Sequence, residues 1–471
     1  MLIYLCRRHK YLYLLCINDI HINRTVKGDK NLTEGKISQK IILFALPIFL
    51  GNLFQQLYNV VDSLVVGNVL GKEALAAVSS TGSLIFLITG FISGIFVGAS
   101  VIISHYFGAE DIKNLSTAVH TTIALGFIGG AIITAIGVGL SPLFLKLMKT
   151  PDNVYVEAVT YLRLYFAGGI ATVIYNACMG IFQAIGDSKR PLHYLMISTI
   201  TNIVLDILLV TIYDFGIKGA AIATVVSQLV SAILAFIKLT RIDDCYKIYI
   251  NQIKIDWNML KRLLKMGLPT GIQNSVISLA NVIVQSNINS FGSVSMAGSG
   301  SYSKLEGFSF LPITSFSVAL TTFIGQNLGA KKYERAKKGA RFGVAVGVSL
   351  AEIIGIFIWI FAPTLIGFFN SDPEVIKYGV MHARTTSLFF FLLAISHCLA
   401  GILRGAGKTD VPMFVMLISW CLIRISYITI AVKIIPDVRV IYWAYPLTWC
   451  ISSIIFVIYY KKSNWMMSNK I

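Results

Sequence analysis

Apolar segments of roughly twenty residues recur along almost the whole chain, with short polar connections between them. Because a helix satisfies its backbone hydrogen bonds internally, such a segment crosses the hydrocarbon core of a bilayer as an α-helix. Hydrophobic residues make up 56% of the 471 residues and charged residues only 13%, a composition that excludes an ordinary soluble domain. The sequence therefore predicts an all-α polytopic membrane protein.

Twelve transmembrane helices are expected, joined by connections too short to hold a soluble domain. The predicted spans are residues 37–66, 76–104, 115–140, 155–184, 190–212, 217–238, 260–290, 296–326, 336–361, 375–403, 409–432 and 440–460. Spans longer than the bilayer requires imply tilted helices or protruding ends. The domains that follow are a basic tail at 1–36, an N-terminal six-helix lobe at 37–238, a linker at 239–259, a C-terminal six-helix lobe at 260–460 and a tail at 461–471.

The net charge of +18 comes mainly from Lys and Arg in the two tails, the linker and alternate short loops. This distribution is typical of the cytoplasmic loops of membrane proteins, so we do not expect nucleic-acid binding. It predicts that both termini are cytoplasmic, in a protein of the cell membrane. The seven cysteines lack the spacing of a disulfide framework or a zinc site. The sequence contains no HExxH or Walker A motif, so we expect neither an enzyme, nor ATP drive, nor a cofactor.

The two halves of the chain repeat each other in near-constant register. Matching pairs are Leu46-Pro47 with Leu268-Pro269, Gly108-Ala109 with Gly329-Ala330, Gly180-Ile181 with Gly401-Ile402, Gly186 with Gly407, and Pro191 with Pro412. An even number of spans per half predicts two parallel repeats related by an axis along the membrane normal. A substrate path then runs between the two lobes.

A polar stripe lies in the first predicted span. Asn52, Gln55, Asn59 and Asp62 recur at the spacing of one helix face. A carboxylate inside a membrane helix is costly unless it faces a cavity or a partner, so Asp62 is a functional candidate.

A second carboxylate, Asp206, lies one helical turn after Asn202 in the fifth span. Asn176 in the fourth span and Thr224 in the sixth add further oxygen ligands. Together with Asp62, these residues predict a cation-coupling site that binds H⁺ or Na⁺; for Na⁺ the ligands are Asp62, Asn202, Asp206 and Thr224. The alternative is that the polar groups only hydrogen-bond between helices.

The C-terminal half has lost both carboxylates, because the repeat places Val284 opposite Asp62 and Tyr427 opposite Asp206. Coupling through acidic groups is therefore expected in the N-terminal lobe alone. The seventh span keeps a polar stripe, and the eighth contains two intramembrane charges. Our candidates for substrate binding are Gln55, Asn59, Asn281, Gln285, Lys304 and Glu306. A row of small residues, Gly90, Gly94 and Gly98, predicts close helix packing rather than a binding site.

The chain resembles the multidrug and toxic compound extrusion (MATE) transporters over roughly residues 31–460. The stretches that carry the resemblance are Ala45–Pro47, Gln56–Asp62, Gly180–Asp187, Asn202–Asp206, Gly219–Thr224, Gly325–Ala330 and Gly401–Gly407. The resemblance implies two six-helix lobes in a V and cation-coupled efflux of organic, mostly cationic amphipathic drugs. It also implies a cation site at Asp62, Asn176, Asn202, Asp206 and Thr224. Met179 departs from the family, because some members have Asn there.

These features together predict an antiporter, functional as a monomer, that exports small organic cations in exchange for H⁺ or Na⁺. One alternative is a flippase for lipid-linked or polysaccharide precursors, which a cationic cavity with Lys304, Arg384 and Arg424 would favour. Another is a membrane-embedded enzyme, which would need clustered catalytic side chains that the sequence does not offer.

Overall fold

The computed structural model describes residues 31–148 and 150–467, apart from some side chains between 61 and 79, and these ranges contain no β-strand. The helices of the N-terminal half are α2 (Ile37–Val65), the π-helical turn η1 (Val66–Leu70), α3 (Gly71–Gly108), α4 (Ile112–Leu147), α5 (Asp152–Ala167), α6 (Gly169–Ala184), α7 (Lys189–Asp206), the π-helical turn η2 (Ile207–Ile212) and α8 (Gly216–Arg241). A linker containing η3 (Ile250–Gln252) follows. The C-terminal half contains α9 (Trp257–Asn289), α10 (Ser293–Gly329), α11 (Tyr333–Gly367), α12 (Pro373–Thr386), η4 (Ser387–Phe389), α13 (Phe390–Gly405), α14 (Asp410–Met416), the π-helical turn η5 (Leu417–Ile423), α15 (Arg424–Ile434) and α16 (Val438–Lys462).

The protein is a multi-pass membrane protein, and all twelve predicted spans are helical. Among the described residues, 10 helical spans are long and apolar enough to cross a bilayer, and α5 with α6 gives an eleventh. The remaining span is α9, a helix of 33 residues. Its polar side chains lower its hydropathy, although its length is more than sufficient.

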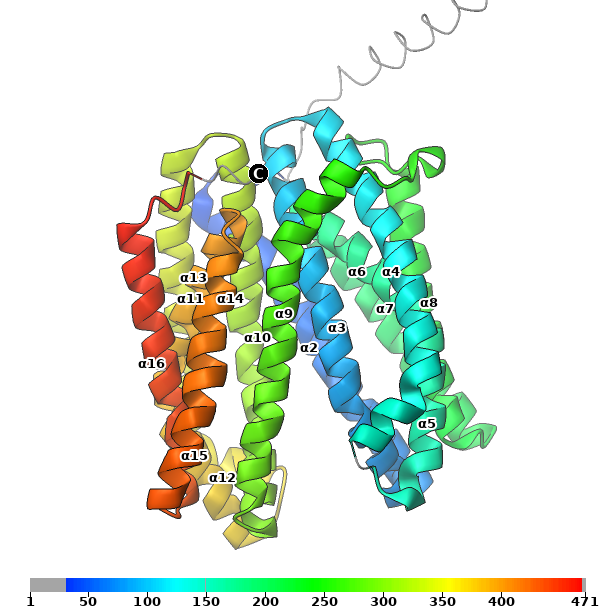
Figure 1. Cartoon of the computed structure of the whole chain (residues 1–471), viewed down its shortest axis with the longest axis vertical. Helices are drawn as coiled ribbons and strands as arrows, with labels where there is room; N and C mark the ends of the chain where they lie inside the picture. The colour runs from blue at the N-terminus through cyan, green and yellow to red at the C-terminus, as the bar shows by residue number, and fades with distance from the viewer. Residues whose placement is uncertain (1–30, 149, 468–471) are drawn as a thin grey trace, which may run out of the picture.

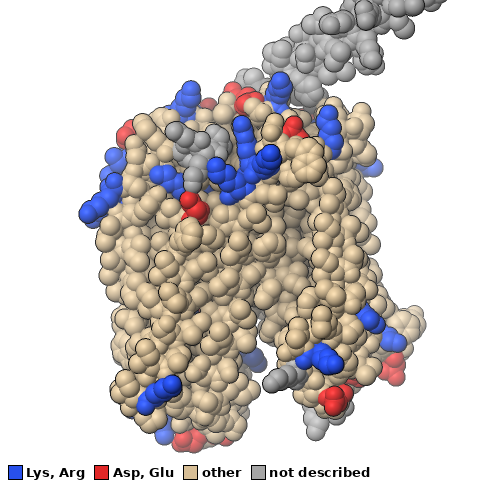
Figure 2. Space-filling view, viewed as in Figure 1, with Lys and Arg blue, Asp and Glu red and all other residues tan. Residues whose placement is uncertain are grey.

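The helices form two lobes, α2–α8 and α9–α16, which join at one end of the molecule and separate toward the other (Figure 1). Figure 2 shows that Lys and Arg gather at the joined end, while a hollow divides the lobes at the opposite end. We call these the basic end, at which α16 ends, and the open end. The expected two-lobed V is confirmed.

The first helix of each half packs into the other half at the basic end. Leu32, Ile41 and Phe44, at and before the start of α2, belong to a hydrophobic core made mainly by α10, α11 and α13. Likewise Met259 and Leu263 of α9 belong to the core of the N-terminal lobe. This reciprocal exchange ties the lobes together where they meet.

Close contact between α3 and α9 forms the seam between the lobes. A Cβ atom on Gly94 would lie 2.4 Å from the backbone nitrogen of Gly271, and one on Gly98 would lie 2.2 Å from that of Gly267. Only glycine permits this approach, so the predicted packing role of the small-residue row is confirmed.

Two spans predicted as continuous are broken. The span 155–184 divides at Gly168 into α5 and α6, which are bent by 48°. A Cβ on Gly168 would lie 2.6 Å from the Val225 side chain, so α8 approaches the chain closely at this bend. The span 375–403 is interrupted by η4, where the Glu352 carboxylate of α11 accepts the Phe391 N–H at 3.2 Å and so satisfies a freed backbone donor.

Candidate functional site

The centre of the N-terminal lobe is built on Asn202 and Asp206 of α7, each only 1% exposed. Their spacing of one helical turn places both side chains on the inward face. With the Asn202 amide oriented to satisfy both partners, its nitrogen donates to Asp206 Oδ2 at 2.8 Å and its oxygen accepts from Thr224 N at 3.2 Å. The structure therefore brings three of the predicted site residues into direct contact.

Thr224 of α8 is 4% exposed and extends the cluster to α2. Its Oγ1 lies 3.2 Å from the hydroxyl oxygen of Tyr58 and donates to Ala220 O at 3.1 Å. Tyr58 was not among the predicted site residues, although its position in the sequence indicated it. Tyr58 stands four residues before Asp62 and so shares its helix face.

Asp62, which the sequence predicts as the second coupling carboxylate, has a side chain outside the described residues. Its backbone is part of α2. The π-helical turn η1 that follows α2 contacts both η2 and α8, so the end of α2 lies beside the ends of α7 and α8 at the open end.

Asn176 of α6 is half-buried, and its Nδ2 donates to Thr172 O at 2.8 Å. The Thr172 hydroxyl in turn hydrogen-bonds the Gln228 side chain, which is one turn after Thr224 on α8. Asn176 is thus tied to α8 through Thr172 of its own helix. Thr172 was not predicted, because a lone threonine in an apolar helix gives no sequence signal.

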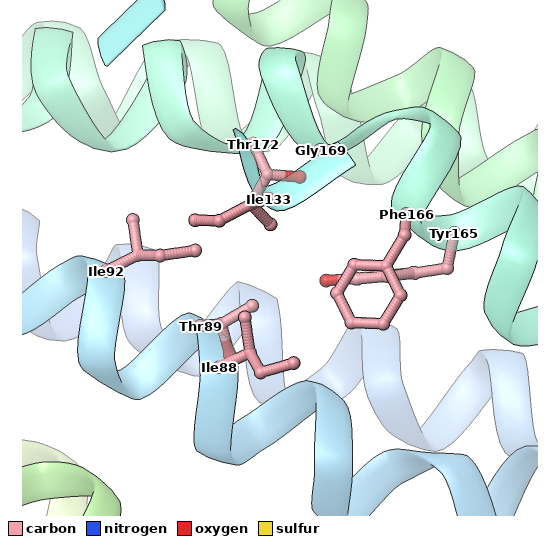
Figure 3. A pocket seen from close by; sticks show the side chains of 8 residues that line it. All are labelled: Ile88, Thr89, Ile92, Ile133, Tyr165, Phe166, Gly169 and Thr172. Atoms are coloured by element: carbon pink, nitrogen blue, oxygen red, sulfur yellow. The ribbon is translucent and has the colours of Figure 1, made fainter. Parts of the chain in front are cut away.

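A small cavity, with room for about one water molecule, adjoins this second group of residues at the bend between α5 and α6. Figure 3 shows its lining side chains pointing into a common space from α3, α4, α5 and α6. The lining residues are Ile88, Thr89, Ile92, Ile133, Tyr165, Phe166, Gly169 and Thr172. The cavity is therefore mostly apolar, with three hydroxyl groups at its wall.

The residues predicted to bind substrate are distributed over both lobes. Gln55 and Asn59 of α2 and Asn281 of α9 are exposed. Gln285 Nε2 donates to Asn289 Oδ1 at 2.8 Å on the same helix. Exposed polar side chains within membrane helices belong at a water-filled surface, which the opening between the lobes supplies.

The two predicted charges of α10 have different surroundings. The Lys304 side chain is exposed, with Nζ 5.9 Å from the centre of the Phe369 ring, which lies in the loop before α12. Glu306 is half-buried inside the C-terminal lobe, where it interacts electrostatically with Arg424. They do not form one site. Arg384 is also exposed and stacks 5.5 Å from the Trp359 ring, so the cationic set behind the flippase alternative does not gather in one place.

The chemistry of the N-terminal cluster is that of oxygen ligands around a buried carboxylate. Among the described residues no group of three His, Cys, Asp or Glu could hold a metal ion. Oxygen ligands of this kind are those that hard cations and protons prefer.

The comparisons with known proteins agree with this architecture. The MatE family model matches residues 47–208 and again residues 269–430, once in each half. The chain is 29% identical to the "Probable multidrug resistance protein YpnP" of Bacillus subtilis (strain 168), covering 84% of this chain and 89% of that protein. It is 24% identical to an "FAD transporter" of Shewanella oneidensis, over 90% and 94% of the two chains.

A solved structure shares the fold. It is described as the "outward-facing conformation of a multidrug resistance MATE family transporter of the MOP superfamily", with a TM-score of 0.87, 22% identity, and coverage of 92% of this chain and 97% of the other. The duplicated family match, the two lobes and the similar transporters lead to one conclusion. The chain belongs to the MatE family of multidrug and toxic compound extrusion transporters.

Proposed function

We propose that the protein is an antiporter that exports small organic cations, amphipathic drugs or toxins, in exchange for inward movement of H⁺ or Na⁺. The observation that carries the proposal is Asp206, a carboxylate only 1% exposed in a membrane helix, in contact with the Asn202 amide. A bare carboxylate is costly in this setting. Binding of a proton or Na⁺ removes most of this free-energy cost, and release of the ion restores the cost.

The proposed coupling groups are Asp206 and Asp62, with Asn202, Asn176 and Thr224 positioning or ligating the ion. The internal repeat is the reason for including Asp62 in the site. If the family units 47–208 and 269–430, which are equal in length, are matched end to end, Val284 pairs with Asp62, and Ile428 instead of the expected Tyr427 pairs with Asp206. Val284 and Ile428 pack in one hydrophobic cluster, which supports the proposal that their acidic counterparts share one site.

Substrate is proposed to bind in the opening between the lobes, near Gln55, Asn59, Asn281 and Gln285. The Lys and Arg side chains at the joined end support a cytoplasmic position for that end and for both termini. The protein would then face outward in the cell membrane, as a functional monomer. Substrate and ion compete by favouring different arrangements of the lobes, since a ligand shifts an equilibrium only through differential affinity.

The test is drug efflux by the purified protein in proteoliposomes under an imposed pH or Na⁺ gradient. Coupled efflux should fail in Asp206→Asn and in the double variant with Asp62→Asn, but not in Asp152→Asn, an exposed aspartate in the first turn of α5. Unimpaired coupled efflux in the double variant would refute the assignment. Imposing a Na⁺ gradient with the pH gradient collapsed decides between the two ions.

The substrate class is tested in the same vesicles. Because one relative is an FAD transporter, anionic FAD is compared with a fluorescent organic cation. Export of FAD but not of the cation would replace the proposed substrate class, and lipid flipping without efflux of either would favour the flippase alternative.

A further inference from the structure

The C-terminal lobe contains a buried arginine, Arg424, in the first turn of α15. It is 2% exposed, and its Nε and Nη2 both donate to the Thr448 hydroxyl, at 3.1 and 2.8 Å. Its guanidinium lies 4.5 Å from the centre of the Tyr445 ring and 5.5 Å from that of Trp420. Glu306 of α10 supplies the opposite charge. The contacts to the Thr448 hydroxyl and to the two aromatic rings are ones that a bound cation would also make.

The internal repeat places Arg424 opposite Asn202. Pro191 and Pro412 correspond in the two halves, whereas the family units end at residues 208 and 430, one residue further apart. The turn η5 lies between these two points in the C-terminal half. Since a π-helical turn holds more residues than an α-helical turn, it accommodates the extra residue. The counterpart of Asp206 is then Ile428 rather than Tyr427.

Burial and helix contacts support this correspondence. Asp206 and Ile428 are each 1% exposed, and Asn202 and Arg424 are 1% and 2% exposed. Asn202 contacts the last helix of its half, at Thr224. Arg424 likewise contacts the last helix of its half, α16. The two side chains therefore hold equivalent places in the two lobes.

We propose that Arg424 is a tethered cation that fills the C-terminal counterpart of the N-terminal cation site. Glu306 is its counter-charge, and the lobe binds no transported ion while the guanidinium is in place. This inference rests on the proposed cation site of the N-terminal lobe.

An arginine suits this role because it keeps its charge throughout the physiological pH range and cannot leave. This difference between the two lobes has a consequence for their charge during transport. Ion binding and release change the charge of the N-terminal lobe only, while the interior of the C-terminal lobe stays neutral through its own pair. The titratable groups around the pair are Tyr302 on α10, Tyr445 on α16, Cys421 in η5 and His382 on α12, whose ring packs at a tilt against Tyr302 and stacks on Tyr442.

Replacing Arg424 by asparagine gives the C-terminal lobe the residue that the N-terminal lobe has. Glu306 then lacks its counter-charge, and the cost of an unpaired buried carboxylate is relieved by binding H⁺ or Na⁺. The variant should therefore carry an additional ion in each transport cycle.

The experiment measures the number of H⁺ or Na⁺ ions moved per molecule of fluorescent organic cation exported by full-length protein in proteoliposomes. We expect a ratio about one ion higher in Arg424→Asn than in the unaltered protein, an unchanged ratio in Arg424→Lys, and a return to the original ratio in Arg424→Asn with Glu306→Gln. Arg439→Gln, a side chain 63% exposed at the open end, is the control for loss of a positive charge. An active Arg424→Asn protein with an unchanged ratio would overturn the proposal.

A second variant covers the case in which Arg424→Asn does not fold. Glu306→Gln alone should leave the ratio unchanged, since Glu306 carries no transported ion in the unaltered protein; a lower ratio would overturn the proposal. The proposed cation site of the N-terminal lobe is tested independently of the Arg424 variants. Coupled transport that persists in Asp206→Asn would refute that site, whatever result Arg424→Asn gives.

Discussion

Gly98 of α3 and Gly267 of α9 approach so closely that a Cβ atom on Gly98 would lie 2.2 Å from the Gly267 nitrogen. The obstructing atoms belong to backbone, so no side-chain rotation relieves the overlap. Because the two helices belong to different lobes, this contact holds the basic end closed.

Gly98→Ala should therefore force the lobes apart at the basic end, at a cost of about 1–3 kcal/mol or more. We expect a lower melting temperature in detergent and a longer spin-label distance between positions 113 and 338, which are exposed near the starts of α4 and α11, one in each lobe. Gly129→Ala in α4 is the matched control, because a Cβ there meets nothing within 4 Å. An unchanged distance in Gly98→Ala would show that the contact between α3 and α9 does not hold the lobes together at the basic end.

Gln326 of α10 joins three separate segments at the same end. Its Oε1 accepts the Leu32 N–H at 3.0 Å, and its Nε2 donates to Ala184 O at the end of α6 at 2.8 Å. The side chain is fully buried, so Gln326→Leu leaves a backbone N–H and a carbonyl without partners. Each loss costs about 1–3 kcal/mol.

The expected result for Gln326→Leu is faster hydrogen exchange of residues 32–35 and a lower melting temperature. Gln252→Leu, an exposed glutamine in the linker, makes the same chemical change without these bonds. Equal exchange rates in the two variants would mean that Gln326 does not hold the segment.

The linker between the lobes is fastened through His120 of α4. Its Nδ1 donates to Ser116 O at 2.7 Å, and its Nε2 accepts the Tyr249 N–H at 3.0 Å. This pattern requires the neutral imidazole, because both nitrogens of a protonated ring are donors. The bond to Tyr249 is therefore present while the ring is neutral and is lost when the ring takes up a proton.

Hydrogen exchange at Tyr249, corrected for the intrinsic effect of pH, should therefore show weaker protection at a pH low enough to protonate His120 than at pH 7.5. His120→Gln keeps a neutral acceptor and should make the protection independent of pH. Pronounced pH dependence in the glutamine variant would assign the effect to another group.

The length of the apolar runs was sufficient to predict the twelve helical spans, because it is read from each segment alone. It could not predict the bend at Gly168, which depends on how closely Val225 of α8 approaches. The Gly168-Gly169 pair was a visible warning of a helix break. The one-residue shift at η5 also escaped the sequence analysis, because the pairs used to define the repeat stop at Pro412.

The meaning of intramembrane polar residues depends on contacts that sequence spacing does not reveal. Asn274 of α9 belongs to the polar stripe of the seventh span, and its Nδ2 donates to Gly90 O across the seam at 3.1 Å. Asn202 and Asp206 were predictable as neighbours because they share one helix face. Their contact with Thr224 joins two helices, and it was anticipated from the family resemblance rather than from spacing.

Tyr58 offers a way to perturb the proposed cation site without removing a proposed ligand. Its hydroxyl oxygen lies 3.2 Å from Thr224 Oγ1 and joins α2 to α8. Loss of one such hydrogen bond costs about 0.5–1.5 kcal/mol, which is roughly a 2- to 10-fold change in an equilibrium constant. Tyr58→Phe should therefore weaken the apparent affinity for the coupling ion by that factor and leave the melting temperature nearly unchanged. Tyr155→Phe, which removes a hydroxyl bonded to Pro142 O at 3.0 Å away from the site, should leave ion affinity unaltered. Equal affinities in the two variants would separate Tyr58 from ion binding and restrict the site to α7 and α8.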